Sequence, residues 1–95
     1  PPVVIPPLRT FVVYGPAYGN RPLLGEVLAK DDVRGLTVEA HGVGVDESRM
    51  LSFVVFYFYD GDPKKPANAQ KLIINADDWS EIEEINAAFP VSVKH

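Results

Sequence analysis

The segment from Met50 to Tyr59 constrains the fold more than any other part of the chain. Side chains of a β-strand point alternately to the two faces of a sheet. Here both faces are apolar: one holds Met50, Val54, Phe56 and Phe58, and the other holds Leu51, Phe53, Val55, Tyr57 and Tyr59. A strand with one face in water alternates between apolar and polar residues. We therefore expect this strand to lie inside a sheet, with both faces covered by the chain or by a partner.

Further strands are indicated by β-branched residues and by a period of two. Residues 9–14 and 36–40 are expected strands, and the alternation continues beyond His41 with its parity reversed. A bulge or bend at His41-Gly42 would place both apolar sets on the same side. Residues 46–48 have the composition of a hairpin turn. Residues 70–76 are predicted to form another strand, and residues 91–94 a short last one.

Two segments have helical spacing. Asn20 and Pro22 suit a helix start, and an apolar arc follows at Leu23, Leu24, Val27 and Leu28, although Gly25 keeps a strand as the alternative. Asp77 suits the start of a second helix that ends before Pro90, with an apolar arc at Trp79, Ile82, Ile85 and Phe89. Helices are therefore predicted after the first strand and near the end of the chain.

The expected order is β-α-β-β-β-α, which predicts an α+β fold. In this fold an antiparallel sheet of four to five strands has both helices packed on one face. The 95 residues suffice for one domain. Residues 1–8 contain four prolines and are expected to form an extended arm, followed by a single α+β domain over residues 9–95. That arm is the chief element left to cover the other sheet face.

Composition excludes several classes of function. The chain has 9 Lys and Arg against 13 Asp and Glu, and this net charge of −4 argues against binding to nucleic acid. Its longest apolar run has seven residues, whereas a membrane helix needs about 18. With no cysteine, the chain has no thiol ligand or nucleophile, and no cofactor is expected. Localisation stays open, because proteins without cysteine occur in reducing and oxidising compartments alike.

No catalytic or metal-binding motif is present, so the sequence favours a non-enzymatic role and leaves an enzymatic one open. None of the serines stands in a Gly-x-Ser-x-Gly elbow, and the two histidines, His41 and His95, lack the spacing of a metal site. The favoured hypothesis is a protein-binding module, or a small accessory or inhibitor protein, that acts through the aromatic sheet face. Its partner is another protein or a second copy of the chain. The interface candidates are Phe53, Tyr57 and Tyr59, because aromatic side chains offer large contact areas.

The alternative hypothesis is a small-molecule-binding domain or a minor enzyme. Glu39 and His41 would share one strand face at about 7 Å along the chain, as a base and its orienting carboxylate would. The strand end at residue 14 and the glycine-containing loop after it supply further polar groups. This hypothesis places a pocket near Tyr14, Tyr18, Arg21, Glu39 and His41.

Overall fold

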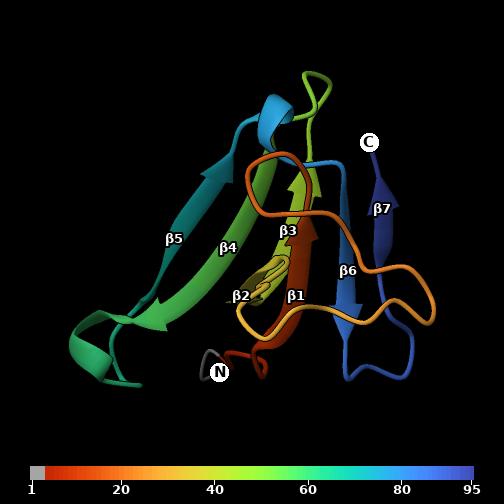
Figure 1. The fold of residues 1–95 in the computed structure, drawn as a ribbon. Coiled ribbons are helices and arrows are strands. Elements are labelled where there is room, and N and C mark those ends of the chain that lie inside the picture. Colours follow the sequence, from red (N-terminus) through yellow and green to blue (C-terminus); the bar gives the residue numbers. More distant parts are fainter. Residues whose placement is uncertain (1–3) are drawn as a thin grey trace.

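Two antiparallel sheets pack face to face in the computed structural model, which describes residues 4–95 (Figure 1). The larger sheet has the strand order β2 (Leu36–Ala40), β1 (Arg9–Tyr14), β6 (Glu81–Ile85) and β7 (Ser92–Lys94). The smaller sheet has the order β3 (Gly42–Val45), β4 (Leu51–Phe58) and β5 (Ala67–Ile74). Within residues 4–95 the only helices are two short 3₁₀ turns, η1 (Tyr59–Gly61) and η2 (Ala76–Asp78). The prediction of an α+β fold with two helices is therefore wrong, and the molecule is a β-sandwich.

The core lies between the two sheets, where side chains from both inner faces meet. The rings of Phe11 on β1 and Phe53 on β4 lie 5.5 Å apart and join the sheets at the centre. The remaining buried apolar side chains come from five strands and from the residue that follows η2: Val13, Val38, Ala40, Leu51, Ile74, Ile82 and Trp79. Trp79 lies at one end of this core, and its indole Nε1 donates a hydrogen bond of 2.8 Å to the backbone carbonyl of Arg49.

The bend expected at His41-Gly42 is confirmed. The chain leaves the larger sheet at Ala40 and enters the smaller one at Gly42, so His41 stands between β2 and β3. Val38 and Ala40 before the bend are buried in the core, and Val43 and Val45 after it pack against the same core. The reversal of parity therefore keeps both apolar sets on the inner side while the chain passes between the sheets.

The helix expected after Asn20 does not form. Residues 20–35 contain no regular structure, and Gly25 has a φ of +82°, which belongs to the left-handed region and ends a right-handed helix. Glu26 in this segment contacts Arg34 at 2.7 Å. A helix needs an apolar surface to cover, but the two sheets already cover each other. Leu23, Leu24 and Val27 consequently point into solvent.

The second expected helix is also wrong, because its residues form η2 and β6. Ile82 is buried in either conformation, so burial of this residue does not distinguish them. As a strand, the segment 81–85 pairs with β1 on one side and with β7 on the other. This double pairing satisfies backbone groups that a helix would satisfy internally, and β-branched isoleucine suits a strand.

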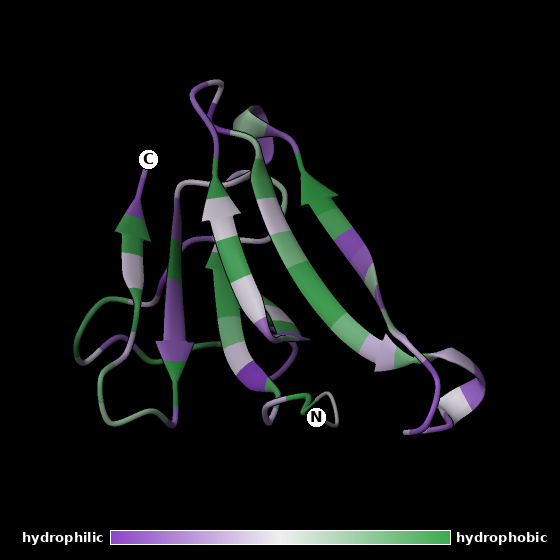
Figure 2. Cartoon of the chain, turned by 180° about the vertical axis from the view of Figure 1, so that it is seen from behind, coloured by the Kyte–Doolittle hydropathy of each residue, from purple (hydrophilic) through white to green (hydrophobic). Residues whose placement is uncertain are grey.

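The strands predicted from the period of two are largely confirmed. β1 and β2 occupy the predicted residues 9–14 and 36–40, and β7 falls within 91–94. β5 runs from Ala67 to Ile74 rather than over 70–76. β4 lies in the middle of its sheet, as its apolar composition required, and Figure 2 shows it predominantly hydrophobic along its length.

The hairpin formed by β4 and β5 (residues 51–74) extends beyond the rest of the sandwich (Figure 1). The molecule measures 49 × 29 × 26 Å. Near Leu51 and Ile74 the hairpin is buried against the other sheet, whereas toward η1 its side chains become exposed. Both faces of this distal half of the hairpin (residues 55–70) therefore reach the surface.

Candidate functional site

The distal half of the hairpin carries the largest exposed aromatic side chains of β4 and η1. Phe56, Tyr57 and Tyr59 are 41%, 42% and 57% exposed, whereas Phe53 on the same strand is 1% exposed. Phe53 thus belongs to the core and presents no surface to a partner. Tyr57 presents a ring at the surface, as proposed from the sequence. The strand ends before Tyr59, which lies in η1, so the two tyrosines do not continue one strand face.

The pairing of β4 with β5 decides which side chains share a face. Directly paired residues lie on the same face of a sheet. Tyr57 pairs with Asn68 on the inner face, and Phe56 and Phe58 pair with Ala69 and Ala67 on the outer face. The two alanine side chains are small, so the phenylalanine rings project beyond them on this face. This outer aromatic face was not among the sequence-derived candidates; the small alternate residues of β5 are the signal that marks it.

His41 completes the outer aromatic region from the bend between β2 and β3. Its Nδ1 accepts a hydrogen bond of 2.8 Å from the backbone N–H of Phe56, and its ring lies 5.7 Å from the ring of Phe56. β3 pairs only with residues 51–54 of β4, so this edge of β4 has no neighbouring strand beyond Val54. The imidazole takes the place that a backbone carbonyl of the missing strand would occupy.

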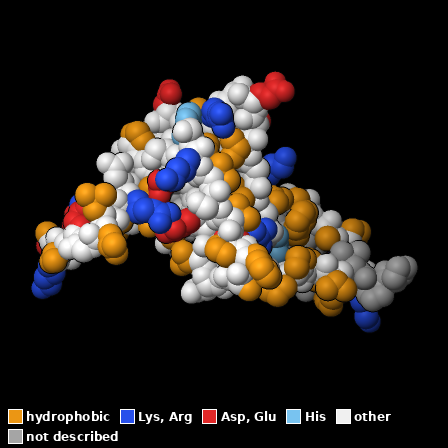
Figure 3. Space-filling view, turned by 90° about the vertical axis from the view of Figure 1, so that its right-hand side faces the viewer, with side chains coloured by type: hydrophobic (Ala, Val, Ile, Leu, Met, Phe, Trp, Pro, Cys, Tyr) orange, Lys and Arg blue, Asp and Glu red, His pale blue; other side chains and the backbone are white. Residues whose placement is uncertain are grey.

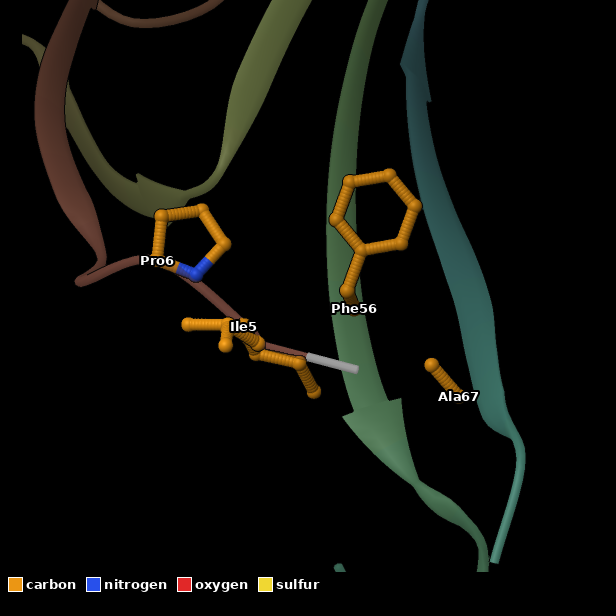
Figure 4. A pocket seen from close by; sticks show the side chains of 5 residues that line it. Ile5, Pro6, Phe56 and Ala67 are labelled. Atoms are coloured by element: carbon orange, nitrogen blue, oxygen red, sulfur yellow. The ribbon is translucent and has the colours of Figure 1, made fainter. Parts of the chain in front are cut away.

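The proline-rich arm lies beside the same aromatic ring. Val4, Ile5 and Pro6 face Phe56 and Ala67 across an open pocket of about 300 Å³ (Figure 4). The arm therefore covers part of the outer face, as the sequence suggested, but Phe56 stays substantially exposed. The first three residues of the predicted arm, 1–3, lie outside the described residues. Figure 3, which faces the side of the molecule where β6 and β7 lie, shows that hydrophobic side chains also reach the surface there.

The alternative pocket is only partly assembled. Tyr14 and Arg21 meet on the outer face of the larger sheet, where the guanidinium lies 5.4 Å from the centre of the tyrosine ring. Arg21 forms ion pairs with Glu81 and Glu83, and the Tyr14 hydroxyl lies 3.5 Å from Glu83. Burial, with the nearby charge of Glu83, raises the pKa of Tyr14. These contacts fasten the loop 15–35 across β1 and β6, and they leave the arginine bound to carboxylates of the chain itself.

The other three residues of that pocket lie elsewhere. Tyr18 packs against the core and accepts a backbone hydrogen bond from Gly35 at 2.7 Å. Glu39 is exposed on β2, opposite Thr10, and His41 contacts Phe56 of the smaller sheet. The structure therefore brings together two of the five residues, Tyr14 and Arg21.

A partly buried ion pair lies at the opposite end of the sandwich from Trp79. Arg9 donates from Nε and Nη2 to the two carboxylate oxygens of Glu84, each at 2.8 Å, and the backbone N–H of Val91 also donates to this carboxylate. The hydrogen bonds from Arg9 hold the pKa of Glu84 at about 2, against the opposing effect of burial. The pair lines a second open pocket of about 450 Å³. Because each charge neutralises the other, we interpret the pair as a structural contact that holds β1 and β6 together.

The described residues show no metal centre. Across residues 4–95 no three His, Cys, Asp or Glu side chains are arranged to hold an ion. In the same part of the chain, no helix combines the length and the apolar character needed to cross a membrane. Comparison of the chain with protein-family models, with curated proteins and with solved structures finds no match in any of the three.

Proposed function

We propose that the protein is a non-enzymatic binding module that holds another protein on the distal half of its β4–β5 hairpin. The observation that carries this proposal is the exposure of Phe56 and Tyr57 on opposite faces of a strand that projects from the sandwich. Exposed aromatic side chains are typical anchors of protein interfaces. Each tyrosine also has a hydroxyl that stays hydrated when the ring is covered.

Charge favours a protein partner on this surface. From Leu51 to Ile74 the chain carries three lysines and two aspartates, while its excess of acid lies outside the hairpin. Lys65 already pairs with Asp60 at 3.0 Å, and its ammonium lies 5.6 Å from the centre of the Tyr59 ring. The aromatic surface is therefore bordered by a few charges of both signs, which resembles the apolar centre and polar rim of protein interfaces.

A phage-displayed library of random peptides provides the test. Peptides selected on the wild-type protein are expected to lose roughly 5- to 150-fold in affinity for Tyr57→Ala or Phe56→Ala, because truncating an interface anchor costs about 1–3 kcal/mol. Leu24→Ala is the matched control, since Leu24 is exposed but lies in the loop 15–35. Selection of no peptide, or of peptides that bind both hairpin variants as well as the wild type, would contradict the proposal.

A further inference from the structure

The outer edge of β5 is the longest strand edge of the smaller sheet. β5 has eight residues and is bordered by β4 on one side only. The N–H of Tyr59 donates to the carbonyl of Pro66, which identifies these two as a hydrogen-bonded pair of the hairpin ladder. Because such pairs alternate along an antiparallel ladder, even-numbered residues of β5 bond to β4. The N–H and C=O groups of Ala67, Ala69, Lys71 and Ile73 therefore point away from the sheet.

One of these outward groups is occupied within the chain. The N–H of Ala69 donates to the side-chain Oδ1 of its neighbour Asn68 at 2.9 Å. Among the described residues no group accepts a hydrogen bond from the N–H of Ala67, Lys71 or Ile73. The edge thus has the regular spacing of free donors and acceptors that another strand needs, with one local cap from a short polar side chain.

The sequence of β5 is self-complementary in one antiparallel register. A second copy of β5 uses all four outward residues of both strands only when Ala67 pairs with Ile73 and Ala69 pairs with Lys71 across the contact. A small side chain then lies opposite a long one at all four hydrogen-bonded pairs, and no lysine faces another lysine. On the inner face Gln70 meets its own copy at the two-fold axis, where the two amides can hydrogen-bond to each other.

We propose that β5 pairs antiparallel with β5 of a second copy of this chain, centred on Gln70, and joins the two smaller sheets into one sheet of six strands. This goes beyond the proposed function, because it uses the backbone edge of the hairpin rather than its aromatic faces. The contact is isologous and closes as a dimer. Asn68 competes with it, since its side chain occupies the N–H of Ala69 that the dimer requires.

Single cysteines on β5 report the register, because the natural chain has none. At the non-hydrogen-bonded position 70, two Cα atoms of opposed strands lie about 4.5 Å apart, within reach of a disulfide. Gln70→Cys is expected to form a covalent dimer under mild oxidation. Asn68→Cys and Leu72→Cys, on the same face, should not do so alone, because each lies about 13 Å along the strand from its own copy. A mixture of these two variants should crosslink.

Equal crosslinking of all three single variants, or none of Gln70→Cys at millimolar concentration, would overturn the proposal. The second test uses charge at Ala69, whose side chain is exposed on β5. Ala69→Glu places a carboxylate opposite Lys71 of the other copy at two symmetric positions, and Ala69→Lys places a lysine there. Sedimentation should show dimerisation strengthened by the first and weakened by the second, each by roughly 2- to 30-fold.

Equal dimerisation of the Ala69→Glu and Ala69→Lys variants would also overturn the register. Different experiments would refute the dimer through β5 and the binding of a partner protein by the aromatic side chains. Tyr57→Ala removes an exposed aromatic side chain and leaves the edge of β5 intact, so it should weaken peptide binding by roughly 5- to 150-fold without changing crosslinking at position 70. The Ala69 variants are assayed by sedimentation alone, because Ala69 pairs with Phe56 on the outer aromatic face.

Discussion

Phe53 and Tyr57 are expected to respond in opposite ways to the same truncation, although both point to the inner face of β4. Phe53 is 1% exposed and its ring contacts Phe11 of the other sheet, whereas Tyr57 is 42% exposed on the projecting part of the hairpin. Phe53→Ala should therefore destabilise the fold, and Tyr57→Ala should chiefly weaken binding.

The magnitude follows from burial. Removing a fully buried phenylalanine side chain costs about 3–5 kcal/mol, because the transfer free energy is lost and a cavity remains. Domains of this size have unfolding free energies of roughly 5–15 kcal/mol, so Phe53→Leu, with an expected loss of about 1–1.5 kcal/mol, provides a variant that stays folded. Tyr57→Ala should cost about 1 kcal/mol, the typical value for a point substitution.

Urea unfolding followed by circular dichroism measures both effects. With a slope of roughly 2 kcal/mol/M, a loss of 4 kcal/mol lowers the midpoint by about 2 M, and a loss of 1 kcal/mol lowers it by about 0.5 M. If Tyr57→Ala lowers the midpoint more than Phe53→Ala does, the assignment of core and surface along β4 is refuted, and with it the aromatic surface assigned to the hairpin.

Three further predictions concern other parts of the molecule. The hydrogen bonds from Arg9 lower the pKa of Glu84 from 4.5 to about 2. The stability that this carboxylate contributes is therefore present above pH 4.5 and is lost as the pH falls towards 2. Acid unfolding of Glu84→Gln should lack this loss of stability between pH 4.5 and 2. Arg21→Ala should release the loop 15–35 from β6, so that limited proteolysis cuts this loop faster than in the wild type. The unfolding free energy should change by less than about 1 kcal/mol, because the ion pairs to Glu81 and Glu83 are only partly shielded from solvent. Filter binding at physiological salt should show no affinity for DNA or RNA, since the net charge is −4, and a micromolar affinity with a steep salt dependence would contradict this expectation.

The strands of strong β composition could be predicted from the sequence because their pattern is local. Residues 9–14 and 36–40 consist of β-branched, aromatic and alternating residues, and they form β1 and β2. The reversal of parity after His41 predicted the bend that transfers the chain between the sheets. The two apolar faces of residues 50–59 required a central strand, and β4 is central.

The surface of the hairpin was predicted in part. Tyr57 is exposed as expected, because a tyrosine near the end of an apolar strand combines a large ring with a polar tip. Phe53, only four residues earlier, has the same alternation, and only its distance from the opposite sheet places it in the core. The exposed edge of β5 could not be predicted from the sequence either. Which strand lies at the edge of a sheet depends on the order of the strands, and the sequence of a single strand does not determine that order.

The two expected helices show why local pattern alone was insufficient. Spacing of apolar residues over 20–30 and 77–89 is compatible with a helix, yet the sequence by itself determined only that these segments are amphipathic. The tertiary structure decided their conformation. β1 and β7 offer hydrogen bonds to both edges of residues 81–85, which makes that segment a strand. For residues 20–30 the sheets had already covered each other's apolar faces, so no buried surface remained to stabilise a helix, and Arg21 binds the chain to Glu81 and Glu83 as a loop.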